Sequence, residues 1–139
     1  MPTAIGCMRL STVPEPDEGR GIAVVHAALD GGARLLDTAD AYAPGPKEIG
    51  HNERMIAAAL RSWAGDRAAV RVATKGGLTR PGGKWVPDGR ARHLLGACEA
   101  SMRALGVERI DLYLLHAVDP KTPLSVVKAW AKNWDRARN

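Results

Sequence analysis

The segment IDLYLLH, residues 110–116, is the clearest strand in this chain. It is short, its middle is apolar, and it ends in a polar side chain, His116. A helical pattern comes immediately before it, with apolar residues on one face and Gly106 as the stop: Leu94, Leu95, Cys98, Met102 and Leu105. A helix that leads directly into a strand is one step of an alternating α/β pattern.

The same alternation continues toward both ends of the chain. Three further strands are predicted, at 4–10, at ARLLD (33–37) and at VRVATK (70–75). Helical spacing follows the first two of them, at Ile22, Val25 and Leu29 and at Met55, Ile56, Ala59, Leu60 and Trp63. A last helix is predicted with Thr122 as its N-cap and Pro123 at its first position. Residues 76–90, rich in Gly and Pro, are predicted to be a long loop. Four strand–helix units in succession predict an α/β fold with a parallel sheet.

The composition is typical of one globular domain, residues 1–139, with 45% apolar and 25% charged residues. No stretch approaches the roughly 18 apolar residues of a membrane span, and the first residues do not resemble a secretory signal. The two cysteines, Cys7 and Cys98, are far apart and lack metal-ligand spacing, so we interpret them as reduced thiols of a cytoplasmic protein.

The net charge of +5 is spread along the chain and is accompanied by only a few scattered aromatic residues. Such a distribution is typical of a solvated surface, and we expect neither a nucleic-acid nor a membrane partner. The segment GLTRPGGK (77–84) is similar to a phosphate-binding loop but has one residue too many before Lys84, and no Ser or Thr follows. No histidine or cysteine pair has metal-ligand spacing, so no metal site is predicted.

Polar side chains stand at the ends of three predicted strands: Asp37, Lys75 and His116. Tyr42 follows Asp37 in the next loop. Because parallel strands end on one edge of a sheet, these four side chains are expected on one rim. A free phenol, with a pKa of ~10, is a weak acid, and an adjacent ammonium favours its ionised form. The four residue types therefore form a coherent acid-catalysis set.

Each of these residues taken alone has an ordinary structural interpretation. Asp37 could cap a turn, with Asp40 equally near, and Lys75 could be a solvated charge. Tyr42 could pack in its loop, and His116 could be a satisfied loop histidine. Their joint occurrence at successive strand ends favours the catalytic interpretation.

Four ordered motifs resemble those of the aldo-keto reductases: LLDTADAY (35–42), HNERMIAAAL (51–60), VATKGG (72–77) and SMRALGVERIDLYLLH (101–116). The resemblance covers residues 4–124 and leaves 125–139 as a divergent tail. It implies a (β/α)8 TIM barrel, of which these four units are the first half, and reduction of aldehyde or ketone carbonyls with NADPH and without a metal. Matching the motifs places the catalytic aspartate on Asp37, the proton-donating tyrosine on Tyr42, the lysine on Lys75 and the histidine on His116.

The chain departs from the family pattern in two ways. The stretch APGPKEIGH lies between Tyr42 and the pair Asn52-Glu53, which alters the loop beside the substrate. The chain is also short, because a barrel of this kind needs ~200 residues or more. The family's nucleotide-binding residues lie mostly in the second half, so none is assigned here. The alternative interpretation is a non-catalytic half-barrel or interaction module left by gene truncation.

Four parallel strands leave two open edges, at the first strand and at residues 110–116. The inward face predicted for them carries Leu35, Ala73, Leu112 and Leu114, without an opposite wall. We therefore expect the chain to self-associate as a homodimer through the open barrel edges, or to aggregate.

Overall fold

The computed structural model describes the backbone of residues 3–136 and the side chains of residues 3–131, so the end of the tail (137–139) lies outside it. Its main sheet has four parallel strands in the order β1-β2-β3-β6. The strands are β1 (Thr3–Gly6), β2 (Ala33–Asp37), β3 (Arg71–Gly76) and β6 (Leu112–Leu115). The predicted α/β fold with four parallel strands is confirmed.

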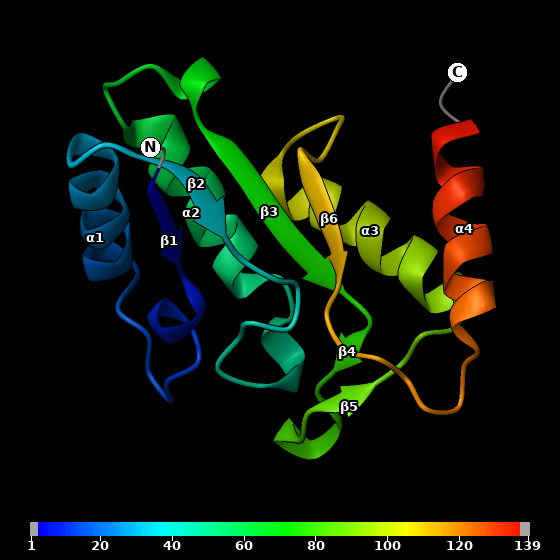
Figure 1. The fold of residues 1–139 in the computed structure, drawn as a ribbon. Coiled ribbons are helices and arrows are strands. Elements are labelled where there is room, and N and C mark those ends of the chain that lie inside the picture. Colours follow the sequence, from blue (N-terminus) through cyan, green and yellow to red (C-terminus); the bar gives the residue numbers. More distant parts are fainter. Residues whose placement is uncertain (1–2, 137–139) are drawn as a thin grey trace.

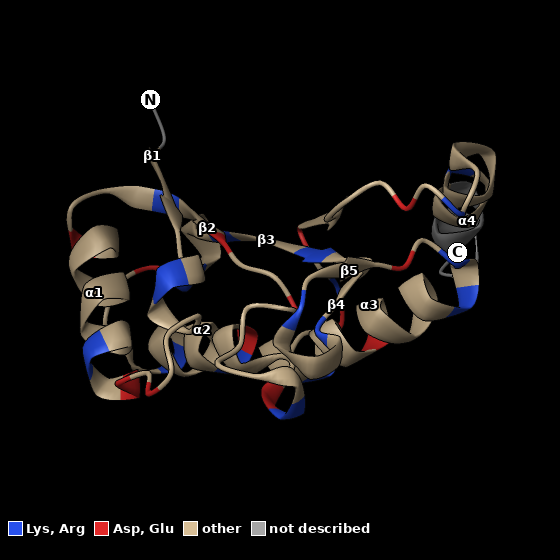
Figure 2. Ribbon diagram, turned by 90° about the horizontal axis from the view of Figure 1, so that it is seen from below, with Lys and Arg blue, Asp and Glu red and all other residues tan. Residues whose placement is uncertain are grey.

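The helices alternate with these strands, and all except the last lie on one side of the sheet (Figures 1 and 2). They are α1 (Glu18–Asp30), α2 (His51–Ser62), α3 (Ala91–Leu105) and α4 (Leu124–Arg136). Asp17 caps α1 by accepting from the Arg20 amide, and Gly106 ends α3 in the left-handed conformation at φ 68°. The start of α1 and the end of α3 therefore follow from local capping signals as well as from apolar spacing.

The hydrophobic core lies between the sheet and the helices. Leu36 on β2 is fully buried against Val25 and Leu29 of α1 and Met55 and Ile56 of α2. α1 approaches α2 closely at Gly21, where a Cβ atom would overlap the Met55 sulfur. One face of the sheet is thereby covered, as the apolar spacing of α1 and α2 predicts.

The structure is more ordered between residues 76 and 90 than the predicted loop. Two short strands, β4 (Leu78–Thr79) and β5 (Val86–Pro87), pair antiparallel there. The Thr79 hydroxyl donates to the Val86 carbonyl at 2.8 Å, and the Arg80 guanidinium lies 3.9 Å from the Trp85 ring centroid. Each strand has only two residues, which is too short for a periodic pattern, so no sequence signal indicates this hairpin.

The first and last strands are shorter than predicted. β1 ends at Gly6, and residues Met8–Leu10 form a 3-10 turn instead. β6 begins at Leu112 because the Asp111 carboxylate accepts the Val72 amide at 2.9 Å, in place of a backbone acceptor. Arg71, which has an unfavourable side chain for a barrel interior, is exposed at the start of β3 and lies 3.8 Å from Asp111.

Candidate active site

All four predicted site residues meet at the carboxyl-terminal edge of the sheet. Asp37 is the last residue of β2, Lys75 lies near the end of β3, and His116 directly follows β6. Tyr42 lies in the loop after β2 and is buried there. Parallel pairing aligns these strand ends, with Asp37 opposite Ala73 and Lys75 opposite Leu114.

The Lys75 ammonium is the centre of the site. Its Nζ donates to Asp37 Oδ1 at 2.6 Å, to the Thr38 carbonyl at 2.8 Å and to the Tyr42 hydroxyl at 3.3 Å. Three acceptors match the three protons of an ammonium group. The Lys75 side chain is only 14% exposed, so the ammonium is held in one place.

Tyr42 and His116 lie against each other edge to face, with ring centroids 5.4 Å apart and planes at 84°. Burial, and to a lesser extent the Lys75 ammonium, lower the pKa of His116, so the imidazole is neutral at neutral pH. Its Nδ1 atom is buried and has no hydrogen-bond partner among the described residues. The ring is therefore placed next to the phenol with a polar atom still unsatisfied.

Backbone contacts hold the loop that carries Tyr42. The Arg80 guanidinium donates to the carbonyls of Ala41, at 3.1 Å, and Ala43, at 3.0 Å, on either side of the tyrosine. The Asn52 amide donates to the Tyr42 carbonyl at 3.1 Å. No sequence pattern indicates this role for Arg80, which lies in the Gly/Pro-rich loop, in the stretch similar to a phosphate-binding loop.

The Asn52 side chain links three segments next to the site by hydrogen bonds. It is fully buried, accepts from the Thr38 hydroxyl at 2.6 Å, and donates to the Cys7 carbonyl at 2.9 Å and the Ser11 hydroxyl at 2.8 Å. Thr38 is the residue whose carbonyl accepts from Lys75. Asn52 therefore fixes the backbone that surrounds the ammonium, although only its place in a motif singled it out in the sequence.

A second polar cluster lies on the helix side of the same strand ends. Glu53 is buried and accepts from the Thr74 hydroxyl at 2.5 Å, and Asp40 is buried beside it. Burial, with the nearby Glu53 charge, raises the pKa of Asp40 to about 7. Both residues line a cavity of about 430 Å³ between α2 and α3, which Lys75 and Tyr42 do not reach. The side chains of this cluster lie outside the rim, although the Asp40 backbone amide donates to the Lys75 carbonyl at 3.2 Å.

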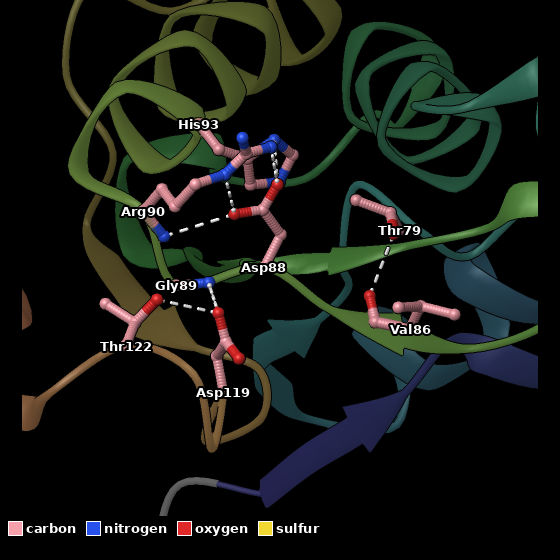
Figure 3. Close-up of polar contacts among 8 residues, drawn as sticks. All are labelled: Thr79, Val86, Asp88, Gly89, Arg90, His93, Asp119 and Thr122. Atoms are coloured by element: carbon pink, nitrogen blue, oxygen red, sulfur yellow. Dashed lines mark hydrogen bonds and ion pairs between the residues drawn. The ribbon is translucent and has the colours of Figure 1, made fainter.

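Hydrogen bonds join the loops that frame the rim (Figure 3). Asp119, after β6, accepts from the Gly89 amide at 3.0 Å and from the Thr122 hydroxyl at 2.7 Å. These bonds, the Gly89 amide first, lower the pKa of Asp119. Asp88 pairs with Arg90 at 2.6 Å just before α3. The hairpin loop and the loop after His116 are thereby joined at one end of the sheet.

Other reactive groups do not contribute to this rim. Burial, the main cause, raises the pKa of the Cys7 thiol to about 12, which leaves it inert. Among the side chains of residues 3–131, no group of three His, Cys, Asp or Glu is arranged to hold a metal ion. The same residues contain no helix that combines the length and the apolar character needed to cross a bilayer.

Known proteins resemble this chain both in sequence and in fold. The model of the aldo/keto reductase family matches residues 3–135, which extends beyond the resemblance ending at 124. The holo form of an aldo-keto reductase from Bacillus halodurans is 30% identical, with a TM-score of 0.78 over 96% of this chain and 42% of that one. A glycerol dehydrogenase from Gluconobacter oxydans is 32% identical, with a TM-score of 0.81 over 96% of this chain and 41% of that one.

The chain thus spans less than half of the length of both structures, and its four strands match part of the family's TIM barrel. Three of the four motifs that suggested the family contain the residues that meet at the rim, and the fourth contains Asn52. The chain belongs to the aldo/keto reductase family.

Proposed function

We propose that this chain carries the proton-delivery half of an NADPH-dependent oxidoreductase that reduces aldehyde or ketone carbonyls to alcohols. The observation that carries the proposal is the set of contacts made by Lys75, whose ammonium touches the Asp37 carboxylate and the Tyr42 hydroxyl together. A phenol, an ammonium and a carboxylate in that order make a proton donor whose charges are balanced.

Tyr42 is the general acid in this proposal. Its hydroxyl gives a proton to the carbonyl oxygen of the substrate, and negative charge develops on the phenolic oxygen as the proton leaves. The Lys75 ammonium, 3.3 Å away, stabilises that charge without having to move. Asp37 keeps the ammonium oriented and charged through the 2.6 Å contact. The phenol recovers its proton from water after the product leaves.

His116 orients the substrate. A neutral imidazole can donate a hydrogen bond to the carbonyl oxygen without competing as an acid, and the lowered pKa of His116 keeps it neutral. Its edge-to-face packing on Tyr42 holds it beside the proton donor. The substrate oxygen would then be shared between the phenol and the imidazole.

The exposed part of the rim could face a nicotinamide cofactor. Such a cofactor, when bound, supplies the hydride that the carbonyl carbon receives. The groups that would face it are Asp37, whose side chain is 40% exposed at the rim, and the half-buried His116. NADPH is the cofactor form we propose, on the basis of the family. The buried thiols Cys7 and Cys98 support the further proposal that the protein works in a reducing cytoplasm.

The chain offers a matched pair of variants to test this function, because it has only two tyrosines. Alcohol formation from a small aldehyde in the presence of excess NADPH should fall ~10²–10⁴-fold in Tyr42→Phe, since only the transferable proton is lost. Tyr113→Phe removes the same atom on the helix side of β6 and should leave the rate unchanged. Equal rates in Tyr42→Phe and wild type would overturn the role of Tyr42. A wild-type chain that forms no alcohol would favour the non-catalytic half-barrel.

A further inference from the structure

The inner face of the sheet, opposite the helices, is not covered by any element in residues 3–136 (Figure 2). We propose that this face is an interface with a second copy of the chain, and that two copies close into one eight-stranded barrel. The proposal does not depend on the reaction proposed above.

Two leucines mark the uncovered face. Leu112 and Leu114 of β6 are 46% and 37% exposed, although they lie in a strand of the main sheet. Their partners in the register are Ala73 and Lys75 of β3, so they project from the same face as the Lys75 ammonium. In a closed barrel this face is the packed interior, where branched apolar side chains fill the centre.

The two outer strands present unpaired edges of the kind that parallel pairing needs. The His116 amide donates toward β3, to the Gly76 carbonyl, so the alternation of a parallel strand points the amides of Tyr113 and Leu115 to the open side. The Cys7 amide likewise donates toward β2, to the Asp37 carbonyl, which leaves the other edge of β1 open. Each copy therefore offers one β1 edge and one β6 edge.

The inner faces of these two edge strands also differ in size in a complementary way. β6 carries the large Leu112 and Leu114, whereas β1 carries Ala4 and Gly6, which pair with Leu35 and Asp37 on that same face. The space beside Gly6 is open, since a Cβ atom there would meet nothing within 4 Å. The leucines of one copy could thus pack over the small residues of the other.

The exposed area is of the right order for a stable dimer. The accessible surface of the chain is 8300 Å². A compact monomer of this mass, 14.8 kDa, exposes about 7,000 Å², so about 1,300 Å² is in excess. A standard protein–protein interface buries about 800 Å² on each partner, which this excess can supply.

The position of helix α4 is also the one that a closed barrel of two copies requires. It lies beyond the β6 edge of the sheet (Figure 1), where Trp130 packs 5.9 Å from the Tyr113 ring between centroids. Leu124 and Val126 on α4 are exposed. In a βα barrel a helix covers the groove between its own strand and the next one, and here the next strand would be β1 of the second copy.

A second copy satisfies these edges by symmetry. A two-fold rotation about the barrel axis places β6 of each copy beside β1 of the other, with all strands parallel. The assembly closes at two copies, because no edge is left. Both rims then lie at the same end, so the two Lys75 sites face one mouth.

The first test measures the mass of the intact chain by light scattering and sedimentation at micromolar concentration. We expect a dimer. Leu112→Lys and Leu114→Lys should each raise its dissociation constant at least ~10-fold and give a monomer with unchanged far-ultraviolet circular dichroism. Leu95→Lys is the matched control, because Leu95 is 40% exposed but lies on α3, in the helix layer. It should leave the dimer intact.

Hydrogen exchange on the unchanged chain gives a second readout that does not depend on how the variants fold. Peptides that contain β1 and β6 should exchange more slowly as the concentration rises through the dimer range, while α3 should not change. A compact monomer, polydisperse aggregates in place of a dimer, or a dimer weakened by Leu95→Lys and unaffected by Leu112→Lys would each overturn the proposal. Edge strands whose exchange is independent of concentration would also overturn it.

Discussion

Lys75 Nζ lies 2.6 Å from Asp37 Oδ1, although the two residues are 38 positions apart in the sequence. The parallel register of β2 and β3 makes this contact possible, because it pairs Asp37 with Ala73. Lys75 lies two residues after Ala73 on β3, so its side chain is on the same face of the sheet. The ion pair thus depends on strand pairing and on nothing local to either residue. It sets the charge balance of the rim.

We expect Asp37→Asn to lower alcohol formation ~10²-fold, because the ammonium loses its negative partner while keeping the Thr38 and Tyr42 contacts. The free energy of unfolding should fall by only about 1 kcal/mol, since the Asp37 side chain is 40% exposed and water screens the pair. Asp111→Asn is the control: Asp111 is 35% exposed and pairs with Arg71 at the other end of β3. A rate loss in Asp111→Asn equal to that in Asp37→Asn would contradict the assignment.

The buried Asp40 should make the protein less stable as the pH rises. Its pKa is raised from 3.8 to about 7, first by burial and then by the Glu53 charge. Between those values the folded chain binds a proton that the unfolded chain has released, so the free energy of unfolding decreases with pH, from about pH 4 to about pH 7. Above that window the full penalty of a few kcal/mol is present.

Urea denaturation across a pH series measures this effect. Asp40→Asn should flatten the decline and stabilise the chain at pH values above the raised pKa. Glu15→Gln changes an exposed carboxylate and should leave the decline as it is in the wild type. Parallel pH curves for wild type and Asp40→Asn would show that Asp40 is not the titrating group.

Gly76 and Tyr113 form a close pair on the helix side of the sheet. A Cβ atom at Gly76 would overlap the Tyr113 hydroxyl, so Gly76→Ala should cost about 1–3 kcal/mol in the free energy of unfolding. Tyr113→Phe alone should be neutral or stabilising, because that hydroxyl is buried without a hydrogen-bond partner in the described part of the chain. The double variant should recover part of the Gly76→Ala loss. Strict additivity in denaturant melts would contradict the proposed overlap.

Cofactor binding by this chain alone should be weak. The family's nucleotide-binding residues lie mostly beyond the part that this chain matches, so the rim supplies few of the contacts. We expect a Kd for NADPH above ~1 mM, which corresponds to a binding free energy weaker than about −4 kcal/mol. Fluorescence titration of the purified chain measures it. Micromolar binding would mean that residues in this half suffice to hold the cofactor.

The order of the helices and of the main-sheet strands could be predicted from the sequence alone, and so could the four residues of the rim. Apolar spacing predicts β2, β3 and three helices close to their observed bounds. The reason is that a strand or helix with one buried face has apolar residues that recur with its own structural period. Asp37, Lys75 and His116 were predictable as neighbours because parallel strands end on one edge, whatever the side chains between them.

How that rim is held, and what lies around it, depends on tertiary contacts. The Arg80 contacts on either side of Tyr42, the Asn52 bonds to Cys7 and Ser11, and the joint burial of Asp40 and Glu53 link residues far apart in the chain. No period or motif encodes such contacts. They depend on how α2 and the hairpin dock against the strand ends, and docking is set by the shapes of whole packed surfaces.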